Sequence, residues 1–380
     1  MTSWVLWTAF SIGGWLLCCA LLRVWASAPP EGDERYAVKT SDGWTLTLRR
    51  FRPKADAAKQ PTPLVLAHGL NMNRGSWALG DEASLIRSFV ARGHETFTVE
   101  YRGTSSSFPP DGQSRWNYDI DDHIDHDIPA LLAEIERLTG TPQVHWVGHS
   151  MGGMLLYLYA GRHGGDRVRR AVTLGSPVRF KLPYRIPRAL ARPIVRRLFS
   201  GTRVPLVTFS FLTLPLVVVF RSLLASKFLN PQHLGGRLVA ALHIRALENV
   251  SGPIYGFFLR LAAERRELAP ASSDSEDDPN SGALERFNVP LLIVSGQIDE
   301  VAPPAAVFPA FEKAGSPIAA YRCFGGPSQQ DQAPAFGHCD LASSEAAVQW
   351  VVPLIASWLE EPHPKAPGAD RTRGLEEAER

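Results

Sequence analysis

The sequence predicts an α/β fold with a mostly parallel central sheet flanked by helices. Three observations support this class: a hairpin pattern near the N-terminus, a short continuous apolar run that ends in glycine, and a regular alternation of strand and helix patterns. Such alternation is typical of βαβ units, in which helices connect parallel strands. The 380 residues suffice for one α/β core that carries an insertion.

The core elements follow in chain order. Strand patterns at residues 35–40 and 44–52 flank the turn Ser41-Asp42-Gly43, and residues 63–69 (PLVLAHG) predict a buried parallel strand. The alternation continues with a helix at 81–92, a strand at 94–100, a helix at 121–138, a strand at 142–148, a helix at 150–162 and a strand at 168–175. A strand at 289–295, a helix near 304–314, a strand at 318–324 and a helix at 343–360 complete the core.

Between these two parts the alternation stops for about 110 residues, which is too long for a plain loop. We therefore expect residues 178–285 to form a mostly helical cap, inserted before the penultimate core strands. The core then comprises residues 34–177 and 286–361. Residues 269–282 have the composition of a solvated acidic linker, and residues 362–380 that of a flexible tail.

The N-terminal segment, residues 1–28, predicts a membrane helix or a signal segment. It supplies about 20 uncharged and mostly apolar residues, the length that spans a bilayer as a helix. No Lys or Arg precedes Trp4, which disfavours a secretory signal, although residues 26–28 resemble a cleavage site. We expect a single-pass anchor rather than a cleaved signal peptide, with a buried core helix as the remaining alternative. Basic residues after the segment favour a cytoplasmic location for the rest of the chain.

The four cysteines are too few for a disulfide scaffold in a chain of this size. Cys323 and Cys339 both lie near the C-terminus, so a disulfide between them stays open. We expect free thiols.

A possible nucleophile lies between the strand at 142–148 and the helix that follows it. Gly148-His149-Ser150-Met151-Gly152 fits the pattern G-x-S-x-G, in which a sharp strand-to-helix turn presents the serine. The helix N-terminus beneath the turn stabilises negative charge. An ordinary turn serine is the alternative interpretation, but the flanking strand and helix favour a nucleophile.

A serine nucleophile needs a histidine base and a carboxylate, in this fold in the chain order serine, acid, histidine. Asp299 follows the expected strand at 289–295, and His338 precedes the final helix. Glu300 is the fallback acid. The alternatives are that Asp299 caps a helix and that His338 only bonds the backbone of its loop.

An ester carbonyl that is attacked also needs donors for its developing negative charge. We expect them to be the backbone N–H groups of Met151 and of Leu70, which follows the strand at 63–69. His68 is expected to structure that loop.

The cluster at residues 119–127 (DIDDHIDHD) suggests a metal site by composition. On a helix its side chains point in different directions, and acidic residues are favourable in the first helical turn. We therefore expect no metal.

These elements together resemble the α/β-hydrolase superfamily, and within it most closely the acid lipase group of esterases. The resemblance is carried by TSDGWTL, PLVLAHGL, WNYDIDDHIDHDIPALLAEIERLTG, VHWVGHSMGG and GHCDL, over most of residues 35–175 and 287–360. It implies a triad of Ser150, Asp299 and His338 beneath a cap that admits a lipophilic ester. The chain departs from that group at Met151, where glutamine is common, and in the cap.

The cap contains a basic segment next to an apolar one. No Asp or Glu lies between Asp166 and Glu248, whereas Lys and Arg number 15 there. Residues 204–220 then form a run of 17 residues without charge. Basic and apolar surfaces side by side favour binding to anionic lipid. The alternatives are packing of the run onto the core and a second membrane crossing, which the prolines disfavour. Aliphatic residues between the basic ones give no indication of a nucleic-acid partner.

The sequence therefore predicts a membrane-associated serine hydrolase that cleaves lipophilic carboxylic esters through an acyl-enzyme, with no cofactor. Two alternatives stay open. One is an acyltransferase or polyester-synthase-like enzyme that uses the same acyl-enzyme, and the other is a non-catalytic membrane-tethered scaffold. The oligomeric state also stays open.

Overall fold

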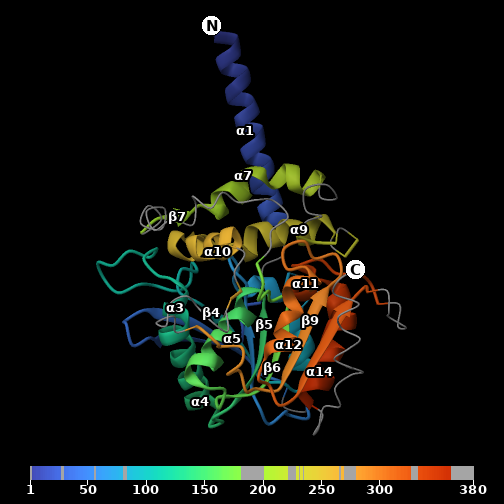
Figure 1. The fold of residues 1–380 in the computed structure, drawn as a ribbon. Helices are drawn as coiled ribbons and strands as arrows, with labels where there is room; N and C mark the ends of the chain where they lie inside the picture. Colours follow the sequence, from blue (N-terminus) through green and yellow to red (C-terminus); the bar gives the residue numbers. More distant parts are fainter. Residues whose placement is uncertain are drawn as a thin grey trace.

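The computed structural model describes residues 2–26, 30–54, 57–79, 84–180, 201–220, 228–230, 232–233, 235–264, 267–268, 280–326 and 333–360. Its central feature is an eight-stranded sheet with the order β1-β2-β4-β3-β5-β6-β9-β10 (Figure 1). The strands are β1 (Glu34–Lys39), β2 (Thr45–Phe51), β3 (Leu64–Ala67), β4 (Thr96–Glu100), β5 (Val144–His149), β6 (Val168–Leu174), β9 (Leu291–Gly296) and β10 (Ala319–Phe324). The β1–β2 and β2–β4 pairs are antiparallel and the others parallel, so the sheet is mostly parallel, as predicted.

Helices cover both faces of this sheet. Alternate residues of β3 point to opposite faces of the sheet. Val65 and Ala67 accordingly belong to one hydrophobic cluster, and Leu64 and Leu66 belong to another. The first cluster packs under α3 (Ile120–Asp122), the π-helical turn η2 (His123–Asp127), α4 (Ile128–Thr139), α5 (Met151–His163), α11 (Pro304–Val307) and α12 (Pro309–Lys313). The second packs under η1 (Arg74–Trp77), α2 (Leu85–Ala91), α13 (Asp340–Ser343), the π-helical turn η5 (Ala347–Val351) and α14 (Val352–Glu360).

Two expected helices are interrupted in the structure. The one near 304–314 is divided into α11 and α12, because Pro309 lacks the N–H that would continue α11. The one at 343–360 is preceded by α13 and broken at Ser344, whose backbone is extended. Ser344 Oγ accepts a hydrogen bond from the N–H of Ala347 at 3.0 Å, so this serine starts the next helical segment.

The described part of the cap is mostly helical, as expected, and lies over the carboxyl end of the sheet (Figure 1). It contains β7 (Arg203–Val204), α7 (Leu206–Val219), α9 (Gly236–Ala241), the π-helical turn η4 (Leu242–Ala246), β8 (Val250–Ser251) and α10 (Gly252–Glu264). The backbone N–H of Asn73, in the loop after β3, donates to Ala246 of η4 at 2.9 Å and so joins cap and core. Residues 181–200, which hold much of the basic segment, 269–279 of the acidic linker and the tail from residue 361 lie outside the described residues.

The N-terminal segment forms helix α1 (Thr2–Trp25), which projects from the body beside α7 (Figure 1). Trp15 Nε1 donates a hydrogen bond to the carbonyl of Leu212 on α7 at 2.9 Å. Within the part of the chain that the structure describes, no helix is both long enough and apolar enough to cross a membrane. The expected single-pass anchor therefore stays a prediction. No disulfide joins Cys323 and Cys339, both of which the structure describes, so the pairing left open is not formed.

Candidate active site

Ser150 occupies the sharp turn between β5 and α5. Its backbone has φ 50° and ψ −117°, a conformation that a residue with a side chain rarely adopts. The turn also requires glycine on both sides. A Cβ atom on Gly148 would lie 2.4 Å from the nitrogen of Gly153, and one on Gly152 would lie 2.2 Å from the carbonyl oxygen of Ala67. The G-x-S-x-G pattern is therefore a packing requirement of this strand-to-helix turn.

The structure brings the other two predicted site residues to this serine. His338 Nε2 lies 2.9 Å from Ser150 Oγ, and His338 Nδ1 lies 2.8 Å from Asp299 Oδ2. Both Asp299 and His338 are buried. The second oxygen of Asp299 accepts hydrogen bonds from the N–H groups of Val301 and Ala302 at 2.8 and 2.7 Å. Its carboxylate is thus held in one orientation by its own loop.

The structure bears on two alternatives that the sequence left open, namely Asp299 as a helix cap and Glu300 as the acid. Helix α11 is capped by Pro303, so Asp299 is not its N-cap. Glu300, the fallback acid, is exposed, whereas Asp299 is buried against His338. The geometry therefore favours Asp299 over Glu300.

Sequence reasoning missed the role of His149, the residue before the serine. Its Nε2 lies 3.0 Å from the carbonyl oxygen of His338, and the two imidazole rings are 4.9 Å apart. Burial lowers the pKa of His149 to about 3, so the ring is neutral and its Nε2–H donates to that carbonyl. This hydrogen bond to the backbone of His338 helps to hold the loop of His338 in place. The G-x-S-x-G pattern allows any residue here and gives no signal for this contact.

Sequence reasoning also missed Asp340, which ties the loop of His338 to the cap. Its buried carboxylate accepts hydrogen bonds from the N–H of Gly337 at 3.2 Å, the N–H of Asn230 at 3.1 Å and His233 Nδ1 at 2.8 Å. Asn230 and His233 of the cap and residues 337–340 of the core therefore hold each other in place. The only sequence signal was the position of Asp340 inside GHCDL.

The residues expected to supply oxyanion donors border the same turn. A Cβ atom on Gly69 would lie 3.1 Å from Ser150 Cβ, which places the loop after β3 against the serine. Leu70 in that loop and Met151 at the start of α5 line one small cavity. Met151 also begins the helix, where the backbone dipole favours negative charge.

His68 has the structural role that was expected for it. Its Nδ1 lies 2.9 Å from the carbonyl oxygen of Gly69, and the side chain is buried. Burial lowers the pKa of His68 to about 4, so the ring is neutral at neutral pH.

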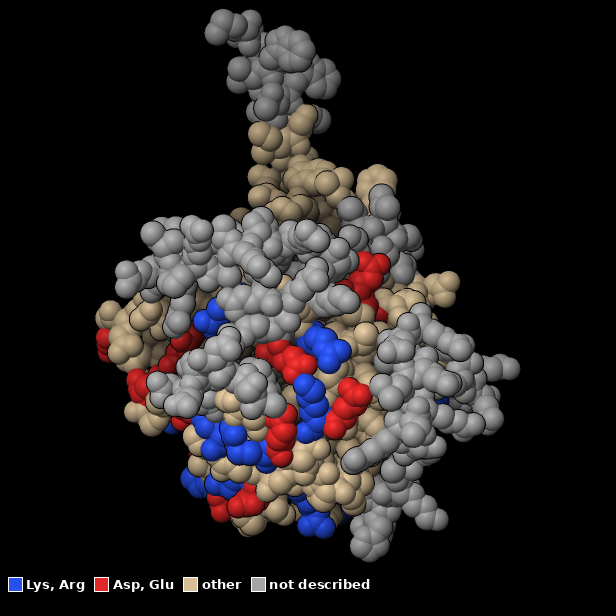
Figure 2. All heavy atoms as spheres, in the orientation of Figure 1, with Lys and Arg blue, Asp and Glu red and all other residues tan. Residues whose placement is uncertain are grey.

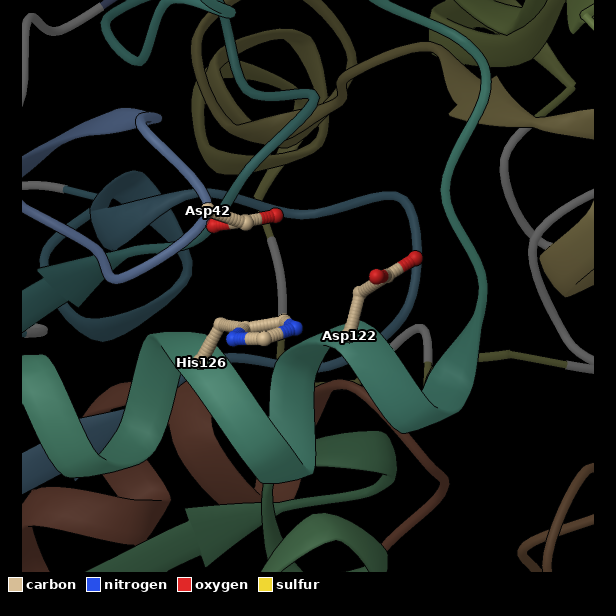
Figure 3. A group of neighbouring side chains, drawn as sticks. All are labelled: Asp42, Asp122 and His126. Carbon is tan, nitrogen blue, oxygen red and sulfur yellow. The ribbon is translucent and has the colours of Figure 1, made fainter.

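The acidic cluster around η2 brings Asp42, Asp122 and His126 within 4.8 Å of one another (Figure 3). These groups already have a cation, because Arg102 Nη1 lies 2.8 Å from Asp42 and 3.5 Å from Asp122. His126 Nδ1 pairs with Ser41 Oγ at 2.7 Å. Three further carboxylates of the cluster are also paired with arginine: Asp127 with Arg102, and Asp121 and Asp125 with Arg162. Asp119 caps α3 and accepts a hydrogen bond from the N–H of Asp121 at 3.0 Å. The cluster is accounted for as an arginine–carboxylate network that fixes η2 to the core.

Comparisons with known proteins agree with the fold described above. The family model described as the alpha/beta hydrolase fold matches residues 62–323. Triacylglycerol lipase 2 of Arabidopsis thaliana is 29% identical over 160 residues, which cover 39% of this chain and 38% of the lipase. Human lysosomal acid lipase/cholesteryl ester hydrolase is 31% identical over 129 residues, 32% of each protein. The chain thus matches about a third of the length of these lipases.

Solved structures show the same fold over most of the chain. The esterase EaEST from Exiguobacterium antarcticum has a TM-score of 0.55 at 17% identity, with 86% of this chain and 100% of that chain covered. The resemblance to acid lipases that the sequence indicated is confirmed by the lipases that match it. Because the family match spans residues 62–323, the chain belongs to the α/β-hydrolase fold family.

Proposed function

We propose that this protein is a serine hydrolase that cleaves carboxylic esters of lipophilic substrates through an acyl-enzyme on Ser150. The observation that carries the proposal is the continuous chain of contacts from Ser150 Oγ through His338 to Asp299, at 2.9 and 2.8 Å. The similarity to lipases supports an ester as the substrate.

In this mechanism Ser150 Oγ attacks the ester carbonyl while His338 Nε2 accepts its proton. Asp299 accepts a hydrogen bond from His338 Nδ1 and stabilises the imidazolium that forms. The N–H groups of Leu70 and Met151 stabilise the negative oxygen of the tetrahedral intermediate. His338 then protonates the leaving alcohol, and water releases the acyl group by the same steps. Removing a member of such a triad costs about 10⁴-fold in turnover or more.

The test is a panel of chromogenic esters from short to long acyl chains, measured on the wild type and on Ser150→Ala. The wild type should hydrolyse the esters and react with a fluorophosphonate probe at Ser150, and Ser150→Ala should do neither. A folded variant that still hydrolyses the panel would exclude Ser150 as the nucleophile. Adding an acceptor alcohol and analysing products distinguishes hydrolysis from acyl transfer.

We further propose that α1 and α7 form a lipid-binding surface, which we call the apolar platform. Its members are large apolar side chains that are exposed on these two helices: Ile12, Trp15, Leu16, Leu17, Leu21, Val24 and Trp25 on α1, and Val207, Phe209, Leu212, Leu216 and Val219 on α7. Contiguous exposed apolar surface of this kind is uncommon on soluble monomers and marks an interaction site. In Figure 2 the described part of α1 that stands clear of the body bears no charged residue on the visible face.

A bilayer is the occupant that fits the apolar platform. Helix α7 contains Pro215 and has 14 residues, which suits a helix that lies in the interface rather than one that crosses it. The basic residues that precede it in the sequence provide attraction to anionic headgroups. The cap also contacts the loops of the candidate site, so lipid at the platform would lie against the part of the chain that covers the carboxyl end of the sheet (Figure 1).

A further inference from the structure

A small cavity adjoins the loop that carries the expected oxyanion donors. Leu70 and Met151 border it on the side of Ser150, and Val250 and Ile254 of the cap also line it. Its interior offers about 20 Å³ for the centre of a water molecule. A site of that size accommodates one water molecule or one hydroxyl group.

Three polar side chains that line this cavity have an atom without a hydrogen-bond partner within the described part of the chain. These atoms are His68 Nε2, Asn71 Oδ1 and Tyr101 Oη, and all three are buried. The side chains of His68 and Tyr101 are only 2% and 1% exposed, and their rings are 5.0 Å apart. Buried polar groups in folded proteins nearly always have a partner, so three such atoms around one cavity indicate a ligand.

The chemistry of that ligand follows from the tautomer of His68. Its Nδ1 faces the carbonyl oxygen of Gly69 at 2.9 Å, and a carbonyl only accepts, so Nδ1 carries the hydrogen. The ring is neutral, because burial lowers its pKa to about 4. Nε2 is therefore an acceptor, as is Asn71 Oδ1, while Tyr101 Oη both donates and accepts. A water molecule satisfies the whole set, because it donates to both acceptors and accepts from Tyr101, and an alcohol hydroxyl satisfies it except for one acceptor. A carbonyl oxygen or an anion can donate to neither acceptor.

The backbone around the cavity is held in a strained conformation. Asn71 has φ 61°, and among the described residues Ser150 is the other non-glycine with a positive φ. The carbonyl oxygen of Asn71 accepts a hydrogen bond from the N–H of Glu248 in the cap at 2.7 Å. Such conformations persist where the surrounding structure enforces them, and they are concentrated at functional sites.

We propose that this hydroxyl cavity, lined by His68, Asn71 and Tyr101, binds one hydroxyl group next to the oxyanion loop. The proposal rests on the proposed ester hydrolase function and adds a specificity element to it. In the free enzyme the hydroxyl is that of a water molecule. During turnover this water either stays and positions the loop, or is displaced by the alcohol part of an ester such as a monoacylglycerol. Tyr101 is its donor in both cases.

The test uses Tyr101→Phe, with Tyr157→Phe as the matched control. Tyr157 is also fully buried, but its hydroxyl pairs with Thr173 Oγ1 at 2.7 Å, away from the cavity. If the cavity holds a hydroxyl, Tyr101→Phe lowers the Tm as Tyr157→Phe does, because each variant loses a hydrogen bond. If Tyr101 Oη has no partner, removing it raises the Tm, and the proposal is overturned.

Kinetics identify the source of the hydroxyl. For a monoacylglycerol and an ethyl ester of the same acid, Tyr101→Phe should lower kcat/KM by about fivefold on both substrates if water occupies the cavity. It should lower kcat/KM on the monoacylglycerol alone if the substrate does. An unchanged kcat/KM on both overturns the proposal. If wild type neither hydrolyses esters nor reacts with the fluorophosphonate probe, the proposed function fails, while the Tm comparison still tests the cavity.

Discussion

The carboxylate of Asp340 lies 2.8 Å from His233 Nδ1, and this contact joins the loop of His338 to the cap. Replacing His233 by alanine leaves a fully buried carboxylate with one donor fewer. We expect His233→Ala to lower stability by about 1–3 kcal/mol. We also expect kcat to fall about tenfold, because the loop of His338 loses its support on the cap side.

His163→Ala is the matched control for this prediction. His163 also pairs with a carboxylate, Asp125, at 2.7 Å, but on the surface and away from Ser150. Its removal should change stability by less than about 0.5 kcal/mol and leave kcat unchanged. Thermal unfolding and ester kinetics measure both variants. Equal behaviour of the two would show that the contact of His233 with Asp340 does not support the site.

Asp299 and Glu300 are adjacent acids that should differ sharply on substitution. Asp299→Asn keeps the size of the side chain but removes the charge that stabilises the imidazolium of His338, so kcat should fall by about 10⁴-fold. Glu300→Gln makes the same chemical change at an exposed position and should leave kcat within about twofold. Both are measured on a soluble short-chain ester. A large loss in Glu300→Gln with an active Asp299→Asn would move the acid to Glu300.

Gly152→Ala tests the packing of the serine turn, and Gly256→Ala on another helix is its control, with the opposite expected effect. In Gly152→Ala the new Cβ would lie 2.2 Å from a backbone carbonyl oxygen, so we expect a loss of about 3 kcal/mol or more and loss of activity. In Gly256→Ala on α10 the new Cβ meets nothing within 4 Å, and alanine favours the helix by about 0.5–1 kcal/mol. Urea unfolding measures both. A neutral Gly152→Ala would contradict the packing found at this turn.

The fold and the convergence of the three candidate triad residues could be predicted because their signals are local. Ser150 lies in a pattern that joins a strand to a helix, and Asp299 and His338 each follow a recognisable strand, so chain order sufficed. The same is true of the parallel sheet, since each strand shows its own apolar run.

The supporting contacts could not be predicted because they join residues far apart in the chain. The bond from His149 to the carbonyl of His338 and the bond from His233 to Asp340 depend on how loops meet at the end of the sheet. The cavity beside Tyr101 likewise exists only once the cap is packed on the core. A single sequence contains the residues for these contacts but no periodicity or spacing that pairs them.

Three buried histidines should make the fold sensitive to acid. Burial lowers the pKa of His68 to about 4 and the pKa values of His145 and His149 to about 3. Below about pH 6.5 the unfolded chain binds protons that the folded protein does not, so each histidine lowers the free energy of unfolding by about 1.4 kcal/mol per pH unit. The loss continues until the pH reaches the folded pKa of each group.

Glu100 acts in the opposite direction, because burial raises its pKa to about 7. Its stabilising contribution is present at low pH and is lost as the pH rises from about 4.5 to 7. Burial also lowers the pKa values of His94 and His243 and raises that of Asp119. Five histidines therefore oppose two acids, so the free energy of unfolding should fall between pH 6.5 and 4.5. Urea unfolding across this range is the measurement. A flat profile would show that the histidines are not buried in neutral form.

Helix α7 should bind lipid through side chains that are exposed in the structure. Phe209 and Val219 are 66% and 69% exposed, and both belong to the apolar platform. Phe209→Ser combined with Val219→Ser should weaken binding to vesicles of phosphatidylcholine and phosphatidylglycerol by about tenfold or more, since each insertion contributes over 1 kcal/mol. Hydrolysis of a soluble short-chain ester should not change, because neither residue contacts Ser150.

Phe108→Ser is the control for this substitution, because Phe108 is 49% exposed on the core rather than on the platform. It should leave vesicle binding unchanged. Co-sedimentation measures binding, and the rate on a long-chain ester presented in the vesicles measures its consequence for turnover. If the double variant binds vesicles as the wild type does while its long-chain rate is also unchanged, α7 does not insert, and any membrane attachment must come from α1 or from the basic segment.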